Sequence, residues 1–182
     1  MLNDIAEILY TEEQIQARVR ELGQQITKDY GLSRDEDLVM VAVLRGAAVF
    51  LVDLSRNMDL SPVVEFMVVE KVHETDGGGE VKIIKDLDIS VTGKHVLVVE
   101  DIIDEGQTLQ YVIDALRIRE PKSLKIVTIF DKPCRRIAQV EADYVGFTVP
   151  DHWVVGYGLD YQQTYRNLPV LAVLKPEIFR RS

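Results

Sequence analysis

The sequence has little cysteine and no excess of basic residues. Cys134 is the one cysteine among 182 residues, so an internal disulfide framework and a cysteine-rich zinc site are excluded. A lone thiol suits a reducing compartment, and we therefore expect a cytoplasmic protein. The 21 basic and 30 acidic residues give a formal charge of −9. This balance argues against a general nucleic-acid or membrane-surface binder, because both need basic surfaces, but it permits a small anionic substrate that responds to local charge.

Long apolar segments and several widespread catalytic motifs are also missing. The longest apolar stretch, Leu38–Val52, is interrupted by Arg45 and Gly46 and is too short to span a bilayer. The sequence contains no G-x-x-x-x-G-K-[ST] loop, no G-x-G-x-x-G turn, no G-x-S-x-G elbow and no H-E-x-x-H pair. These absences argue against a P-loop NTPase, a Rossmann dinucleotide enzyme, an α/β-hydrolase and a zincin.

What is present is an alternation of buried strands and helices in one domain over residues 1–182. A capping box at Thr11–Gln14 predicts the start of a helix that ends near Gly31. Apolar runs without alternation predict parallel strands covered on both faces, and amphipathic segments between them predict helices. The expected fold class is α/β, with a central, mostly parallel sheet flanked by helices. The strands are expected at Leu38–Leu44, Val63–Val69, His95–Val99 and Leu124–Phe130, the helices at Gly46–Asn57 and Gln107–Arg119, and shorter strands at Tyr144–Val149, Val154–Tyr157 and Val170–Leu174.

The segment Glu70–Ile84 differs from the rest because it is rich in glycine and poor in packing residues. It includes Gly77, Gly78 and Gly79, and it predicts either a mobile loop or the tip of a long hairpin.

The strongest chemical pattern is Val98–Leu109, which reads VVEDIIDEGQTL. A predicted strand ends in two carboxylates, and a third carboxylate, a glycine turn and a hydroxyl follow at a helix start. Ligands of open α/β sheets bind beyond the carboxyl ends of the strands. Backbone N–H groups at a helix N-terminus favour phosphate, whereas paired carboxylates suit vicinal hydroxyls or a hydrated cation. One short loop could therefore hold both a sugar and its phosphate.

A second set of motifs makes the pattern specific: DKP at 131–133, DYVGF at 143–147, PDHWVVGYGLDY at 150–161 and YRNL at 165–168. Together, the two patterns resemble the type I phosphoribosyltransferases, which use 5-phosphoribosyl-1-pyrophosphate (PRPP), and within them the bacterial hypoxanthine-guanine enzymes. The resemblance covers most of the chain. It implies a core of about 35–150 with a hood from about 1–12 and 150–182, a homodimer or homotetramer, and purine salvage with Mg²⁺ as cofactor and a 6-oxopurine as second substrate.

The resemblance also implies a role for each matched residue. Asp104 would exchange a proton with the purine N7 as the catalytic acid or base. The 5′-phosphate cradle would comprise Glu105, Gly106, Gln107, Thr108 and Leu109, and the ribose hydroxyls would meet Glu100 and Asp101. Pyrophosphate would meet Arg45, Gly46 and Arg166. The loop Leu44–Gly46 matches one that in this family contains a non-proline cis peptide bond. The purine would contact Lys132, Trp153, Val154 and Asp160, and the metal would contact Glu100, Asp101 and Asp160.

Two of these roles have a physical rationale of their own. A lysine ammonium donates hydrogen bonds and accepts none, so Lys132 favours a 6-oxo purine over a 6-amino purine. An indole face at Trp153 can stack on a purine. Taken alone, the two residues would more often be an exposed lysine and a packed aromatic residue.

The chain departs from the family pattern in the loop that follows the second strand. The Ser-Tyr pair that the family uses there is missing, so closure of the loop would either use other contacts, such as Lys71 or His73, or be weaker. His152 stands where the family usually has a lysine, and Arg45 stands where lysine is commoner. A xanthine- or guanine-preferring enzyme is the first alternative. A PRPP-sensing regulatory protein is the second, although the charge of −9 argues against RNA binding by it.

Overall fold

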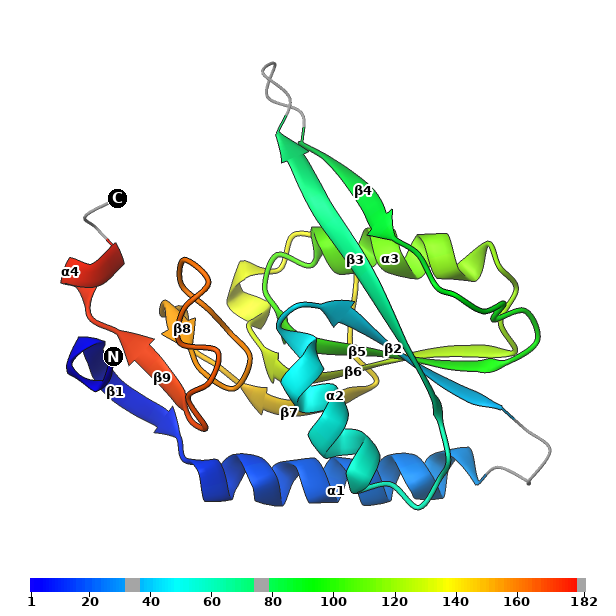
Figure 1. The fold of residues 1–182 in the computed structure, drawn as a ribbon, viewed down its shortest axis with the longest axis horizontal. Coiled ribbons are helices and arrows are strands. Elements are labelled where there is room, and N and C mark those ends of the chain that lie inside the picture. The colour runs from blue at the N-terminus through cyan, green and yellow to red at the C-terminus, as the bar shows by residue number, and fades with distance from the viewer. Residues whose placement is uncertain (32–36, 74–78, 180–182) are drawn as a thin grey trace.

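The computed structural model describes residues 1–31, 37–73 and 79–179, without the side chains of residues 71–80. Its centre is a six-stranded sheet in the order β4-β3-β2-β5-β6-β7 (Figure 1). Strands β3, β2, β5, β6 and β7 run parallel, and β4 pairs antiparallel with β3 at one edge. The strands comprise β2 (Leu38–Leu44), β3 (Val63–His73), β4 (Gly79–Lys85), β5 (His95–Ile103), β6 (Ser123–Asp131) and β7 (Tyr144–Thr148). The α/β fold class is confirmed.

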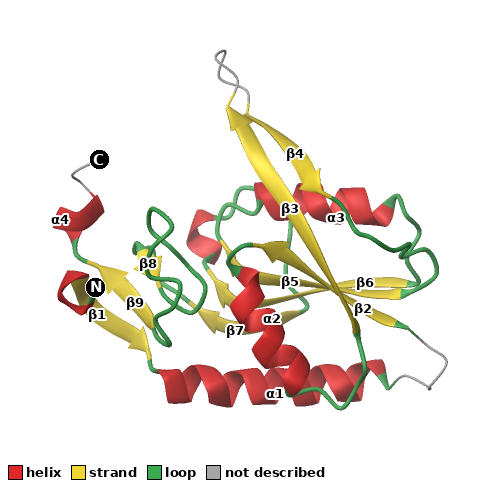
Figure 2. Cartoon of the chain, viewed as in Figure 1, coloured by secondary structure: helices red, strands yellow, loops and turns green. Residues whose placement is uncertain are grey.

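Helices cover both faces of this sheet (Figure 2). On one face, α1 (Glu12–Tyr30) and α2 (Ala47–Arg56) pack against alternate residues of the strands, such as Met40 and Leu97. On the other face, α3 (Gln107–Arg117) packs against the intervening residues, such as Val41 and Val98. Because consecutive side chains of a strand point to opposite faces, uninterrupted apolar runs supply both cores.

A second, three-stranded antiparallel sheet joins the two ends of the chain in the order β1-β9-β8 (Figure 1). It comprises β1 (Ile5–Tyr10), β8 (Val154–Val155) and β9 (Leu171–Leu174), and α4 (Pro176–Phe179) follows it. Strand β1 was not predicted from the sequence. The predicted strand from Val154 to Tyr157 ends at Val155, because Gly156 and Tyr157 turn the chain with positive φ angles of 99° and 48°.

Two further predictions are corrected or completed. Strand β5 does not end at Val99 but continues through Glu100 and Asp101 to Ile103, paired with β6. Residues 70–73 and 79–84 lie in the paired strands β3 and β4, as the hairpin alternative predicts, and residues 74–78 lie outside the described part. The capping box at Thr11 and the left-handed Gly31 at the helix end are both present. Within the described residues, no helix is long and apolar enough to cross a membrane.

Candidate active site

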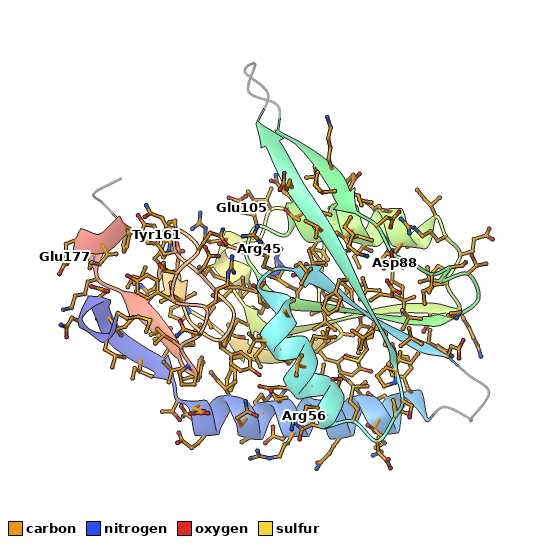
Figure 3. All side chains as sticks on the ribbon, in the orientation of Figure 1. Arg45, Arg56, Asp88, Glu105, Tyr161 and Glu177 are labelled. Carbon is orange, nitrogen blue, oxygen red and sulfur yellow. The ribbon has the colours of Figure 1, made fainter. Side chains whose placement is uncertain are left out.

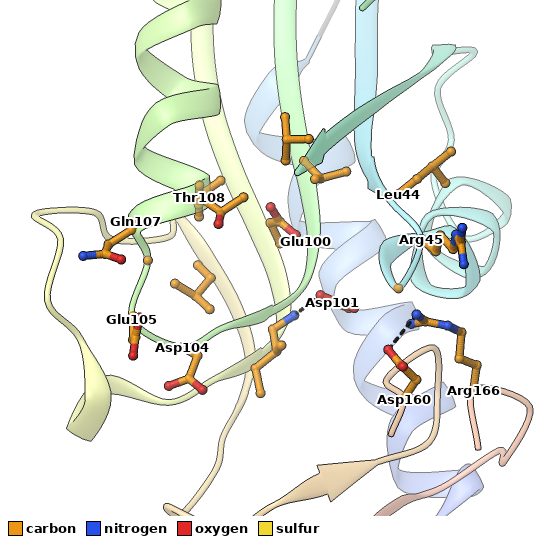
Figure 4. A pocket seen from close by; sticks show the side chains of 17 residues that line it. Leu44, Arg45, Glu100, Asp101, Asp104, Glu105, Gln107, Thr108, Asp160 and Arg166 are labelled. Atoms are coloured by element: carbon orange, nitrogen blue, oxygen red, sulfur yellow. Dashed lines mark hydrogen bonds and ion pairs between the residues drawn. The ribbon is translucent and has the colours of Figure 1, made fainter. Parts of the chain in front are cut away.

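Two adjoining cavities open at the carboxyl ends of the parallel strands, and together they are lined by every site residue predicted above. The first, of about 420 Å³, is lined by Arg45, Gly46, Glu100, Asp101, Asp104, Glu105, Gly106, Gln107, Thr108, Leu109, Asp160 and Arg166 among others (Figure 4). The second, of about 860 Å³, is lined by Lys132, Trp153, Val154 and several residues of β1, β9 and α4. Asp101, Asp104 and Asp160 line both cavities, so a ligand in one can contact a ligand in the other.

Glu100 and Asp101 place two carboxyl groups near the end of β5, Glu100 buried and Asp101 half-buried. They are consecutive on β5 and therefore point to opposite faces of the sheet, as Figure 4 shows. Burial raises the pKa of Glu100 well above its usual range, and the charge of Asp101 raises it further. Burial also raises the pKa of Asp101 to about 6, although a backbone N–H at Ile102 and the guanidinium of Arg166 oppose this shift. Such carboxylates are suited to bind a cation or a hydroxyl donor.

Two glycines permit a close backbone approach beside these carboxylates. A Cβ at Gly46 would lie 1.4 Å from Asp101 Oδ2, and a Cβ at Gly158 would lie 2.2 Å from the Gly46 carbonyl oxygen. The Leu44–Arg45 peptide bond is cis, as the resemblance implied. Any larger side chain at these two glycines would separate the loop after β2 from the acidic end of β5 and from the Gly158 turn.

The loop from Asp104 to Gln107 leads into the N-terminus of α3. Gly106 adopts φ 82°, and a Cβ there would lie 2.7 Å from Val140, so glycine is required on both counts. No side chain of the described residues caps α3, and its first residues, Gln107, Thr108 and Leu109, line the first cavity. This arrangement suits a phosphate.

Asp104 and Lys132 form a charged pair between the two cavities. The Lys132 ammonium lies 3.8 Å from Asp104 Oδ2 and donates a hydrogen bond of 3.0 Å to the carbonyl of His152. Lys132 is only 4% exposed, so it is not a solvated surface lysine. A lysine ammonium has three donors, so Lys132, which lines the second cavity, can donate to a ligand there as well as to His152.

Trp153 is 48% exposed and therefore is not a core aromatic residue. One indole face stacks on Phe179 of α4, with ring centroids 5.5 Å apart and planes 17° apart, and Tyr161 meets the indole edge-on. The indole lines the second cavity together with Lys132, which suits a flat aromatic ligand.

Arg166 and Asp160 are joined to Arg45 by a residue that the sequence did not single out. Arg166 forms an ion pair of 2.6 Å with Asp160 (Figure 4). It also donates a hydrogen bond of 3.0 Å to Gln163 Oε1. Arg45 donates to the same Gln163 oxygen at 2.9 Å, and the Gln163 backbone N–H donates to Asp160. Figure 3 labels both Arg45 and Glu105, which line the first cavity, and the close-up in Figure 4 places them on opposite sides of it. Gln163 carries no charge and belongs to no motif, so sequence reasoning had no signal for it.

Comparison with known proteins agrees with this geometry. Residues 6–162 match the phosphoribosyl transferase domain family. The chain is 49% identical over 180 residues to the hypoxanthine-guanine phosphoribosyltransferase of Bacillus subtilis, covering 98% of each. It superposes with a TM-score of 0.92 on a hypoxanthine phosphoribosyltransferase crystal structure from Staphylococcus aureus, at 49% identity, covering 98% of this chain and 96% of the other. This chain belongs to the phosphoribosyl transferase domain family.

Within that family the chain groups with the hypoxanthine-guanine phosphoribosyltransferases, as the motifs predicted. It is also 49% identical to the bifunctional protein TilS/HprT of Listeria monocytogenes, of which it spans 27% of the length. The shared region therefore corresponds to a whole protein in one relative and to part of a larger protein in another.

The acidic residues of this phosphoribosyltransferase fit a hydrated cation better than a dry metal cage. Among the described residues no group of three or more His, Cys, Asp or Glu side chains comes together, so Glu100, Asp101 and Asp160 do not form one ligand set. Mg²⁺ retains several waters and is held by one or two carboxylates together with substrate phosphates. Asp101 and Asp160 line both cavities and suit that role, and Asp160 would have to leave its ion pair with Arg166.

Proposed function

We propose that this chain transfers the 5-phosphoribosyl group of PRPP to hypoxanthine or guanine, and that the two cavities divide the substrates. PRPP occupies the first cavity, with its 5′-phosphate at the α3 N-terminus and its pyrophosphate beside Arg45 and Arg166. The 6-oxopurine occupies the second cavity, between Trp153 and Lys132. The observation that carries this proposal is the pairing of Asp104 with Lys132, because together they complement the adjacent N7–H and 6-oxo groups of one purine edge.

The reaction exchanges one bond at the anomeric carbon. The purine N9 forms a bond to C1′ of ribose, and the bond from C1′ to the pyrophosphate oxygen breaks, so that its electron pair leaves with pyrophosphate. The proton on N7 passes to the Asp104 carboxylate, which leaves the product neutral at the base. Charge at C1′ in an oxocarbenium-like transition state faces the carboxylates of β5.

The groups around the leaving pyrophosphate favour bond cleavage. Arg45 and Arg166 are held together by Gln163, so two guanidinium groups face the same region. Mg²⁺ held by Asp101 and Asp160 would supply additional positive charge to the pyrophosphate when bound. We propose Mg²⁺ as the cofactor on the chemistry of these carboxylates.

The test is incubation of the purified chain with PRPP, Mg²⁺ and one base at a time, with products identified by mass. We expect the nucleoside monophosphate with hypoxanthine and guanine and little product with adenine, because Lys132 has no lone pair for a 6-amino group. Xanthine as the best substrate would favour the xanthine-preferring alternative. Absence of nucleotide with every base would contradict the proposal and favour a PRPP-sensing protein.

A homodimer or homotetramer in the cytoplasm stays a prediction. Light scattering of the purified chain measures the oligomeric state. The exposed free thiol of Cys134 supports a reducing compartment.

A further inference from the structure

We propose that Arg135 is a positioning residue, which holds one oxygen of the Asp104 carboxylate so that the other is presented to the purine N7. The inference rests on the proposed function and adds a residue that belongs to none of the sequence motifs. Arg135 Nε lies 3.3 Å from Asp104 Oδ1. Its other guanidinium nitrogens lie 3.9 Å from Glu105 and 3.7 Å from Asp151.

The two oxygens of Asp104 have different surroundings. The side chain is 38% exposed, yet Oδ1 is buried and accepts no hydrogen bond from the described residues. The exposed part of the carboxyl group is therefore on the side of Oδ2, which is also the oxygen 3.8 Å from the Lys132 ammonium. Oδ1 faces Arg135, and Oδ2 faces the base cavity beside the group that would bind the 6-oxo atom.

Arg136 binds the backbone around Asp104, whereas Arg135 contacts the Asp104 carboxylate. Arg136 donates to the carbonyls of Ile103 and Asp104 and pairs with Asp131. The backbone N–H groups of residues 137 and 138 both donate to the Glu105 carbonyl at 3.0 Å. These contacts fix the chain at Asp104 but none of them reaches its carboxylate.

Arg135 itself is held in place by its own turn. It ends the short 3₁₀ helix Pro133–Arg135 directly after Lys132, and its backbone N–H donates to the Lys132 carbonyl. The same turn therefore carries both cations that meet Asp104, one at each oxygen. The Arg135 side chain is 44% exposed and lies between the loop after β5 and Asp151, which also lines the base cavity. Its removal should not unfold the protein.

Two purine analogues isolate the contact between Asp104 and N7. In 9-deazahypoxanthine a carbon replaces N9, so the N7–H donor is kept. In 7-deazahypoxanthine a carbon replaces N7, so that donor is lost. Both are neutral 6-oxo bases. Loss of the positive charge of Arg135 should therefore change both dissociation constants by the same factor. The ratio of their dissociation constants, measured by calorimetry with Mg²⁺ and pyrophosphate so that no turnover occurs, reports the geometry of Asp104.

We expect the wild type to prefer the 9-deaza analogue, and Arg135→Ala to reduce that preference by about fivefold or more, as for contacting residues. Arg135→Lys should resemble the alanine variant, since an ammonium cannot reproduce the guanidinium geometry. Arg117→Ala removes an arginine at the end of α3, 66% exposed, and should keep the wild-type ratio.

An Arg135→Ala or Arg135→Lys protein with the wild-type ratio would overturn the inference, as would a wild type that prefers neither analogue. These results differ from a failure of the proposed function, in which the wild type forms no nucleotide and binds neither base.

Discussion

Asp104 lies where the two cavities meet, and we expect its carboxylate to contribute little to the stability of the fold. Its contacts are ion pairs with Lys132 and Arg135, and its side chain is partly exposed. We therefore expect Asp104→Asn to fold normally and to lower kcat by about 100-fold or more, because proton transfer of this kind contributes 10²–10⁴-fold. The KM for PRPP should change by less than about threefold, since the phosphate contacts remain. Steady-state kinetics with hypoxanthine measure both quantities, and turnover within about threefold of wild type would remove Asp104 as acid or base.

Asp101 gives the ligand-free protein a pH-dependent stability. Burial raises its pKa from 3.8 to about 6, so between these values the folded state keeps the proton that the unfolded state has lost. The resulting stabilisation is present below about pH 4 and is lost as the pH rises through the folded pKa near 6. We expect Asp101→Asn to be more stable than wild type at pH 7.5 by about 1–3 kcal/mol, and to show a smaller difference at pH 4.5.

Urea unfolding at the two pH values measures this effect. The matched control is Asp114→Asn on the surface of α3, for which the difference from wild type should be the same at both values. An Asp101→Asn protein whose gain is equal at pH 4.5 and pH 7.5 would contradict the assignment to this carboxylate.

The individual residues of the site divide into those with a motif and those without one. Asp104, Lys132 and Arg166 lie in short, specific strings, so their place at the site was predictable. Gln163 and Arg135 were not, because their contacts depend on how the loops fold back. Gln163 adopts φ 62°, and Arg135 follows a proline turn, and neither feature changes hydrophobic periodicity. Positions that act through loop geometry leave no pattern for sequence reasoning to detect.

Among the elements, strands that are buried on both faces were predicted, whereas a strand or strand end that depends on pairing with a distant segment was not. Apolar runs such as Leu38–Leu44 identify strands covered on both faces, whatever their partners. Strand β1 has exposed residues at its centre, and it is a strand because β9 pairs with it from the far end of the chain. Likewise β5 continues through two acids because β6 accompanies it. Hydrophobicity reports burial, whereas pairing across long sequence separations is decided by the tertiary fold.

One side-chain contact joins the C-terminal segment to the helices that pack beneath it. The Tyr157 hydroxyl donates to Asp53 Oδ2 of α2 at 2.7 Å, and Gln16 of α1 donates to the same oxygen at 2.7 Å. Burial raises the pKa of Tyr157 well above its usual range, so the hydroxyl stays a donor at working pH. Tyr157 stands between Gly156 and Gly158, and Gly158 touches the loop that contains Gly46. The contact therefore holds the turn before Asp160 against the loop that contains Arg45 and Gly46.

We expect Tyr157→Phe to lower the free energy of unfolding by about 1–3 kcal/mol, because a partly buried carboxylate loses a donor. The KM for PRPP should rise while the proton-transfer step is left intact, since the turn positions Asp160 and Arg166. Urea unfolding and steady-state kinetics give the two values. Tyr111→Phe, at an exposed position of α3, is the matched control and should behave as wild type. A Tyr157→Phe protein with wild-type stability would show that the hydroxyl bond contributes nothing net.

For the molecule as a whole, the formal charge of −9 taken alone would oppose a substrate as anionic as PRPP. Charges separated by more than about 8 Å are largely screened at physiological salt, so the surface acids contribute little at the site. What matters is the local set, in which Asp101 and Asp160 share the first cavity with Arg45 and Arg166. In the ligand-free protein the Asp160–Arg166 ion pair neutralises part of this set. The two carboxylates therefore compete with pyrophosphate for the arginines unless a cation joins them.

This local balance predicts that PRPP binding depends on Mg²⁺ through the pyrophosphate group. We expect the dissociation constant for PRPP, measured by calorimetry, to be at least about tenfold higher in EDTA than in millimolar Mg²⁺, because carboxylates and pyrophosphate repel in its absence. Ribose 5-phosphate is the matched ligand control, since it keeps the phosphate that meets the α3 N-terminus and lacks the pyrophosphate. Its affinity should change by less than about threefold, because backbone N–H groups need no metal to bind a phosphate. An equal loss of affinity for PRPP and for ribose 5-phosphate in EDTA would show that Mg²⁺ acts on the fold rather than through the pyrophosphate group. Equal PRPP binding with and without Mg²⁺ would show that Arg45 and Arg166 alone offset the two carboxylates.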